Sequence, residues 1–170
     1  MEKFRFKWLL KHVSVVLKHK WFVFVAGRQT GVSYWRMLIH DWTKLLPIEA
    51  LAYARYFNGS KDDPEGFARA WLHHQNCNPH HWEYWIARSG HKVGPGEAKV
   101  LEMPEQFVHE MVADWMAASR AYTGSWDMTK WLRENFWTKI TLHPKSRYFA
   151  RVLLYELGYD DKTLRNPALA

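Results

Sequence analysis

The chain has 170 residues, 48% of them hydrophobic and eleven of them tryptophan, a composition that favours one folded domain with a substantial core over a disordered chain. Its single cysteine, Cys77, excludes an internal disulfide framework and a cysteine-rich zinc site, and favours a reducing compartment such as the cytoplasm. The net charge of +7 suits an anionic partner, such as a nucleotide, a nucleic acid or a membrane surface.

The first predicted element is a helix over Phe4–Ala26, which ends near two glycines. The stretch is basic and partly apolar, as a signal peptide or a membrane anchor would be. Lys11, Lys18 and Lys20 interrupt it, however, and its longest apolar run, "WFVFVA", is too short to span a bilayer. We therefore expect a packed first helix, with a peripheral amphipathic helix as the alternative.

Capping residues and prolines predict three further helices in the first half of the chain. Ser33 can cap "YWRMLIHDWTKLL", and Pro47 opens a helix that continues through "ALAYARYF". Asp63 followed by Pro64 starts a helix with the sequence "EGFARAWLHHQ".

The second half of the chain continues this pattern. A fifth helix is expected over Asn78–Gly90, with Asn78 as its N-cap, and "HKVGPGEAKVLEM" is typical of a loop or a small hairpin. Pro104 opens a sixth helix, "EQFVHEMVADWMAASRAY", and two more are expected near Thr129–Ile140 and Pro144–Leu157. No repeat or linker divides the chain, so the prediction is an all-α, single-domain bundle of seven to eight helices over residues 1–170.

The ten histidines can be sorted by helical periodicity. His74 continues the apolar positions of its helix at i, i+3, i+4 and i+7 spacing and should face inward, whereas His73 lies nearer the flank. His12 lies among leucine and valine residues and should also face inward. His19 stands between two lysines and is expected at the surface.

Two helices place carboxylates beside these histidines. In the second helix one stripe contains a histidine, an aspartate and a lysine, and it runs beside an apolar stripe; the first stripe is Met37, His40, Asp41 and Lys44, and the second is Trp35, Leu38, Ile39, Trp42 and Leu45. In the sixth helix Glu110 and Asp114 share a face with apolar residues. A buried carboxylate needs a compensating partner, which a metal ion supplies.

Each of these residues also has an ordinary structural interpretation. A single histidine is more often a hydrogen-bonded helix residue than a ligand, Lys44 alone could complement a helix dipole, and Asp114 alone could be a solvated flank residue. Histidines on four helices and carboxylates on two, all at inward positions, together indicate a metal site.

The order of these residues resembles the HD superfamily of metal-dependent phosphohydrolases, in which an isolated His, an adjacent His-Asp pair and a late Asp converge on a metal. The sequence "HDWTK" resembles the HDxxK core of that superfamily. "HHQNCNPHHWEYW", "EMVADW" and "WTKITLHPKSR" are similar to an uncharacterised HD-like family common in phage genomes, over His12 to about Arg151. A phage origin would place the protein in the host cytoplasm.

The resemblance implies a ligand set. The first metal would be held by His12, His40, Asp41 and Asp114, with Asp41 able to bridge to a second metal held by His74 and His81. The choice of His81 over His80 is left open, and the other histidine would bind substrate or orient a ligand. One or two divalent transition-metal ions are expected, and histidine and carboxylate ligands suit manganese, iron, cobalt and zinc alike.

The leading functional prediction is hydrolysis of a phosphate ester, such as a nucleotide, by a metal-activated water. The predicted catalytic residues are Asp41, Lys44 and Glu110, with Glu110 as a proton-transfer group or as an orienter of a ligand. Lys44, His80 and Tyr84 are the predicted substrate contacts. An HD-type di-iron oxygenase and a basic helical nucleic-acid-binding protein with structural histidines are the two alternatives.

Overall fold

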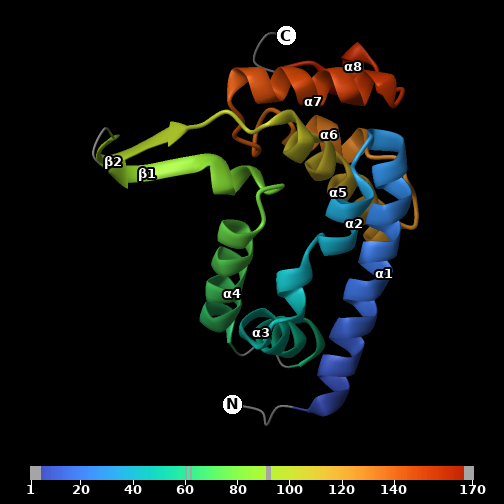
Figure 1. Cartoon of the computed structure of the whole chain (residues 1–170), viewed down its shortest axis with the longest axis vertical. Helices are drawn as coiled ribbons and strands as arrows, with labels where there is room; N and C mark the ends of the chain where they lie inside the picture. Colours follow the sequence, from blue (N-terminus) through green and yellow to red (C-terminus); the bar gives the residue numbers. More distant parts are fainter. Residues whose placement is uncertain (1–4, 60, 62, 91–92, 167–170) are drawn as a thin grey trace.

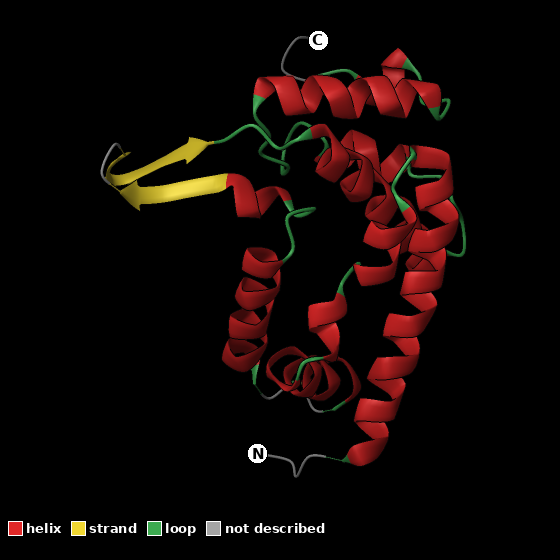
Figure 2. Ribbon diagram, in the orientation of Figure 1, coloured by secondary structure: helices red, strands yellow, loops and turns green. Residues whose placement is uncertain are grey.

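The computed structural model describes residues 5–166, except for residues 60, 62, 91 and 92. It is an all-α bundle with one small two-stranded sheet, which confirms the predicted fold class (Figure 1; Figure 2). The longest helix, α1 (Phe6–Thr30), packs most extensively against α5 (Glu105–Thr123) and also against α3 (Pro47–Asn58). Among the described residues, no helix is both long enough and apolar enough to cross a bilayer.

Helix α1 continues four residues beyond its predicted end at Ala26, to Thr30, and is closed by the second of the two glycines. Gly31 adopts a left-handed conformation with φ 75°, and its N–H donates to the carbonyl of Gly27. This closure suits glycine because it has no Cβ to clash in that region of the backbone map.

The second predicted helix is broken in two, so the prediction of one continuous helix is wrong. The chain forms α2 (Tyr34–Ile39), leaves helical geometry at His40 and Asp41, and resumes as the short 3₁₀ helix η1 (Trp42–Leu45). Asp41 has φ 54°, in the left-handed region. Lys20 of α1 stabilises the break, because its Nζ donates to the carbonyl oxygens of residues 38 and 40, at 2.9 and 2.5 Å.

Helix α4 (Pro64–Cys77) begins as predicted, since the Asp63 side chain accepts a hydrogen bond from the Gly66 N–H. The prediction of a fifth helix over Asn78–Gly90 is wrong, and so is the N-cap role of Asn78. The chain instead makes a 3₁₀ turn, η2 (Trp82–Trp85), and then strand β1 (Ile86–Gly90), which pairs antiparallel with β2 (Val93–Val100).

Cross-strand pairing explains this outcome. Ile86 lies opposite Val100, and such a β-branched pair stabilises a sheet more than a helix. The position of Trp85 is also fixed by a hydrogen bond, because its Nε1 donates to the carbonyl of Pro79. The segment after Gly90, predicted as a loop or a small hairpin, supplies only the second strand of the hairpin, and the first strand comes from the predicted fifth helix.

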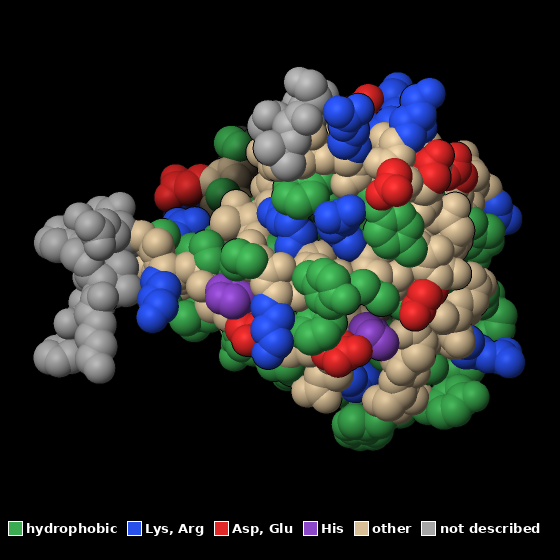
Figure 3. Space-filling view, turned by 90° about the horizontal axis from the view of Figure 1, so that it is seen from above, with side chains coloured by type: hydrophobic (Ala, Val, Ile, Leu, Met, Phe, Trp, Pro, Cys, Tyr) green, Lys and Arg blue, Asp and Glu red, His purple; other side chains and the backbone are tan. Residues whose placement is uncertain are grey.

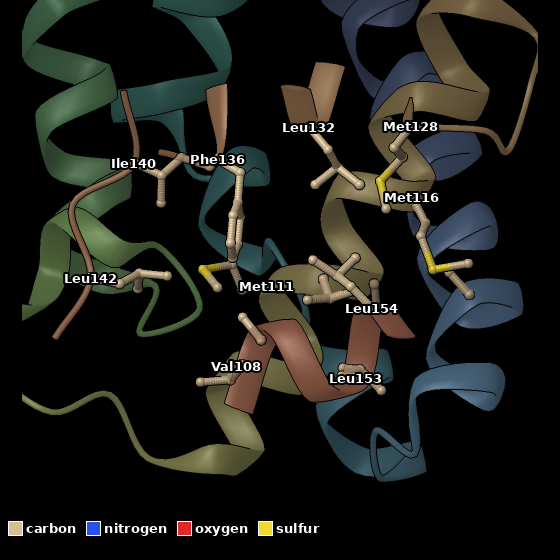
Figure 4. Close-up of a cluster of buried hydrophobic side chains, with 14 of the residues drawn as sticks. Val108, Met111, Met116, Met128, Leu132, Phe136, Ile140, Leu142, Leu153 and Leu154 are labelled. Carbon is tan, nitrogen blue, oxygen red and sulfur yellow. The ribbon is translucent and has the colours of Figure 1, made fainter. Parts of the chain in front are cut away.

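The C-terminal third closes the bundle and carries the main apolar core. Helices α6 (Thr129–Asn135), α7 (Pro144–Glu156) and α8 (Asp161–Leu164) follow α5, and α8 was not predicted. Apolar side chains of α5, of α6 and the residue that follows it, and of α7 meet in this core, including Val108, Met111, Met116, Leu132, Phe136 and Leu154 (Figure 4). The histidine cluster lies outside it, around α1, the break at residues 40–41, α4 and α5.

Candidate metal centre

Seven histidine and aspartate side chains form two overlapping groups that share Asp41. Within each group the nitrogen and oxygen atoms all lie within 4.8 Å of one another; one group is His19, His40, Asp41 and Asp114, and the other is Asp41, His74, His80 and His81. The side chains come from α1, the break after α2, α4, the segment before η2, and α5. Residues far apart in the sequence therefore converge on two adjoining positions.

Asp41 stands at the junction of the two groups and is fully buried. Its Oδ1 lies 3.2 Å from Nε2 of His74 and 3.3 Å from Nε2 of His80. Its Oδ2 lies 3.4 Å from Nε2 of His40 and 3.5 Å from Nε2 of His19. One carboxylate oxygen thus faces each group, which is the arrangement that a bridging carboxylate requires.

Glu110 holds two of the histidines from outside. Its Oε1 accepts a hydrogen bond from Nδ1 of His40 at 2.9 Å and lies 3.3 Å from Nδ1 of His80. Its Oε2 accepts two hydrogen bonds from the Arg36 guanidinium, at 2.8 and 2.5 Å. Because Nδ1 of each ring is occupied, Nε2 is left to point at Asp41.

Glu49 likewise orients a histidine of the other group from outside it. It accepts from Nδ1 of His74 at 3.0 Å and from Nδ1 of His73 at 2.7 Å. Asn78 is buried beside them, and its Nδ2 donates to Oγ1 of Thr43 and to the carbonyl of His74, each at 2.8 Å. Sequence reasoning missed Glu49 and Thr43 and took Asn78 for a helix cap.

Several polar atoms of the cluster are buried without a hydrogen bond of acceptable geometry among the described residues. They are Nε2 of His19, Nε2 of His40, Nε2 of His80 and Oδ1 of Asp41. Buried polar atoms without a partner are costly, and a metal ion satisfies such atoms directly. Imidazole nitrogens and carboxylate oxygens suit a divalent transition metal, so the residues present fit an ion in either group.

Electrostatics keep the carboxylates of the cluster ionised. Burial acts to raise the pKa of Asp41, but the charges of His40 and Lys44 hold it well below its usual range. The pKa of Asp114 is likewise well below its usual range, because the close approach of the His19 and His40 rings to its carboxylate outweighs burial. Two anionic carboxylates, Asp41 fully buried and Asp114 with its side chain 16% exposed, make the site attractive to a cation.

The pKa values of His40, His74 and His81 are shifted in two opposite directions. Burial acts to lower the pKa of His40, but the carboxylates around it raise it well above the ordinary value. The pKa of His74 is also raised, against burial, by its bonds to Asp41 and Glu49. The pKa of His81 is well below the ordinary value, because the ring is buried and His80 adds positive charge. His81 is therefore neutral at physiological pH and ready to act as a ligand.

A profile of DUF5662, a family of unknown function, matches residues 9–153. The chain belongs to DUF5662. The matched range contains all seven side chains of the two groups, from His19 in α1 to Asp114 in α5. No curated protein and no solved structure matches the chain.

In this DUF5662 chain the structure brings together five of the six predicted ligands: His40, Asp41, His74, His81 and Asp114. His12 is the exception, and its assignment is corrected. Its ring is buried as predicted, but Nε2 lies 2.9 Å from the carbonyl oxygen of Lys44 and the ring stacks on Tyr53 at 5.7 Å.

His19 takes the place predicted for His12. It was expected at the surface, yet its side chain is only 13% exposed and its Nε2 lies 2.9 Å from Oδ1 of Asp114. The flanking lysines misled the prediction, because Lys20 is itself turned inward to the break after α2. A histidine between two lysines on a long helix is therefore not always a surface residue.

The three predicted substrate contacts lie at different places relative to the two groups: one inside, one at the edge and one outside. His80 is buried within the second group with His81, so the two histidines are not alternatives. Lys44 lies at the edge of the cluster, 21% exposed, with its Nζ 2.5 Å from Oδ2 of Asp41. Tyr84 is 43% exposed and lies outside both groups, in contact with Trp85.

Proposed function

We propose that this chain is a metal-dependent phosphohydrolase of the HD type that acts on a nucleotide or a similar phosphate ester. His19, His40, Asp41 and Asp114 would hold one divalent ion, and His74, His80, His81 and Asp41 would hold a second. Ions bound there would supply an activated water and neutralise phosphate oxygens.

The position and charge of Lys44 are the observation that supports a phosphate substrate. Its ammonium is bonded to the shared carboxylate of Asp41, yet its side chain still reaches solvent. Burial acts to lower the pKa of Lys44, but the charges of Asp41 and Asp114 raise it above the ordinary value. A lysine that stays protonated at the open edge of a metal cluster suits a substrate that carries negative charge.

Glu110 and Glu49 act as positioning residues in this proposal. Of the two roles predicted for Glu110, its contacts fit the orienting one, because His40 and Arg36 occupy its two oxygens. Bonds from the histidines lower its pKa strongly against burial, so it remains ionised and has no proton to donate. Each glutamate fixes which ring nitrogen faces the cluster.

The two alternatives make different use of the same residues. An oxygenase could employ the same ligands, but an uncharged substrate would give Lys44 no role. A nucleic-acid-binding protein with structural histidines would leave unexplained why three imidazole nitrogens and a carboxylate oxygen are buried without hydrogen bonds.

The decisive experiment compares Lys44→Met with Lys18→Met, an exposed lysine of α1 outside the cluster. Metal content by elemental analysis and phosphate release from a panel of nucleotides and generic phosphate esters are measured on the same preparations. We expect Lys44→Met to retain its metal and to lose activity by about ten- to a thousandfold, the scale for one charge-stabilising contact. Lys18→Met should match the wild type.

Three outcomes would contradict the proposal. Wild-type protein that takes up no manganese, iron, cobalt or zinc would refute the metal centre. Dioxygen consumption by the metal-loaded protein, without phosphate release from any ester, would favour the oxygenase. Salt-sensitive nucleic-acid binding that survives chelation, again without phosphate release, would favour the third function.

A further inference from the structure

The segment from Tyr34 to Leu51 has an unusual surface. Every residue that is exposed in this segment is apolar or aromatic. Trp35 is 66% exposed, Leu38 is 65% exposed and Trp42 is 52% exposed. The apolar stripe seen in the sequence therefore faces outward, where helical periodicity alone would have assigned it to a core.

The charged residues of the same segment are all paired with side chains in or beside the cluster. Arg36 binds Glu110, Lys44 binds Asp41, and Glu49 binds His73 and His74. The polar side chains of the segment thus contact the cluster, and the side chains that the segment exposes to solvent are apolar. Elsewhere the surface is mixed: over α7 and α8, lysine, arginine and acidic side chains alternate with apolar ones (Figure 3).

The exposed apolar surface continues beyond this segment toward α1 and borders a groove near α4. Toward α1, the ring of Phe24 lies 6.1 Å from that of Tyr34 and 5.8 Å from that of Trp21, which is itself exposed. Toward α4, Ile48 and Leu51 line a groove of about 610 Å³. We call the whole surface the apolar face; it comprises Trp21, Tyr34, Trp35, Leu38, Ile39, Trp42, Leu45, Ile48 and Leu51.

We propose that the apolar face is a dimer interface, covered by the same face of a second copy of this chain. Its size fits that role. Nine large side chains, each roughly half exposed, present on the order of 800–1,000 Å². Monomeric proteins seldom show more than about 600 Å² of continuous apolar surface, whereas a stable interface needs about 800 Å² from each partner.

Composition identifies a protein rather than a lipid surface as the partner. Interface cores are rich in tryptophan and tyrosine and poor in lysine and glutamate, as the apolar face is. Peripheral membrane helices pair their apolar side with exposed lysine and arginine for anionic headgroups. Arg36 and Lys44, the basic residues of 34–51, are paired with carboxylates of the cluster, and the exposed Arg69 that lines the groove is paired with Glu65.

Shape favours a second copy over an unrelated partner. A twofold interface brings the same patch of both chains together, so a patch that carries both projecting rings and a recess can complement itself. The apolar face has both. The exposed tryptophans Trp35 and Trp42 are the projections, and the groove beside Ile48 and Leu51 is the recess.

The test is the molar mass of the full-length protein by sedimentation equilibrium across the micromolar range. The wild type should show twice the chain mass of 20.3 kDa. Trp35→Glu and Leu38→Glu should each raise the dimer dissociation constant by about thirty-fold or more, the scale of a central interface residue. Tyr148→Glu is the matched control, because Tyr148 is 64% exposed on α7, outside the apolar face. The dissociation constant of this variant's dimer should equal that of the wild type.

Circular dichroism and metal content show whether each variant is folded, and a misfolded variant is replaced by Leu45→Glu. A wild type that stays monomeric throughout the range would overturn the proposal. Cosedimentation of that monomer with phosphatidylcholine or phosphatidylserine vesicles would assign the apolar face to a lipid surface instead. Dimers that dissociate no more readily in Trp35→Glu and Leu38→Glu than in Tyr148→Glu would also overturn it.

Discussion

His12 and His19 offer a sharp test of the metal centre, because the sequence and the structure assign them opposite roles. The structure places His19 beside Asp114 and Asp41, and His12 against the Lys44 carbonyl and Tyr53. We expect His19→Ala to lose metal and His12→Ala to lose stability.

The magnitudes follow from the contacts. Removing a residue that only orients a metal ligand weakens binding by about ten- to a hundredfold, so loss of the ligand His19 should weaken binding at its group by more than about a hundredfold. His12→Ala removes one hydrogen bond and one stacked ring pair from a buried position. These contacts are worth roughly 1–3 kcal/mol of unfolding free energy, which lowers the melting temperature by roughly 2–12 °C in a chain of this size.

Two measurements check this pair. Elemental analysis and calorimetric titration give the metal stoichiometry and affinity, and thermal unfolding after chelation gives the stability of the metal-free chain. If His12→Ala loses metal without a fall in melting temperature, or if His19→Ala keeps its full metal content, the geometry described for the first group is wrong.

Three further predictions concern the same cluster. His74→Ala should lower metal content far more than His73→Ala, since His74 bonds Asp41 and His73 bonds only the outer Glu49 and Cys77; equal losses in elemental analysis would contradict this. Asp41→Ala should lose metal from both groups, as the shared carboxylate requires, and retention of one full ion would show that Asp41 does not bridge. The pKa of His40 is raised, so its contribution to stability is present below about pH 6.5 and is lost as the pH rises through that raised pKa. The melting temperature of the metal-free protein should therefore fall as the pH rises above about 6.5. Metal affinity should increase over the same range, because a proton no longer competes for the imidazole. If the melting temperature changes with pH in the same way with and without chelator, this prediction is refuted.

The sequence predicted the helical architecture and the inward position of His74 because both depend on local patterns. Proline and capping residues marked the starts of α3, α4, α5 and α7, and the apolar spacing of α4 separated His74 from His73. Periodicity failed where tertiary contacts override it. Adjacent side chains on a continuous helix point about 100° apart, so His40 and Asp41 can converge only because the helix breaks between α2 and η1.

The supporting residues could not be found from the sequence for a different reason. Glu49 occupies the first turn of α3, where a glutamate is ordinarily explained by the helix dipole. Its bonds to α4 depend on how α3 and α4 pack, and no local pattern encodes that. His19 is similar, because only the inward turn of Lys20 reveals that this side of α1 faces the cluster.

The left-handed backbone at Asp41 restricts which residues the chain can tolerate there. A residue with a Cβ pays about 1–2 kcal/mol in this region, and asparagine and aspartate pay least. Asp41→Asn therefore removes only the charge, whereas Asp41→Ala and Asp41→Glu also change the cost of the backbone conformation. Comparing the metal-free stability of the Asn and Ala variants gives the energy stored in the turn separately from the electrostatic energy of the cluster.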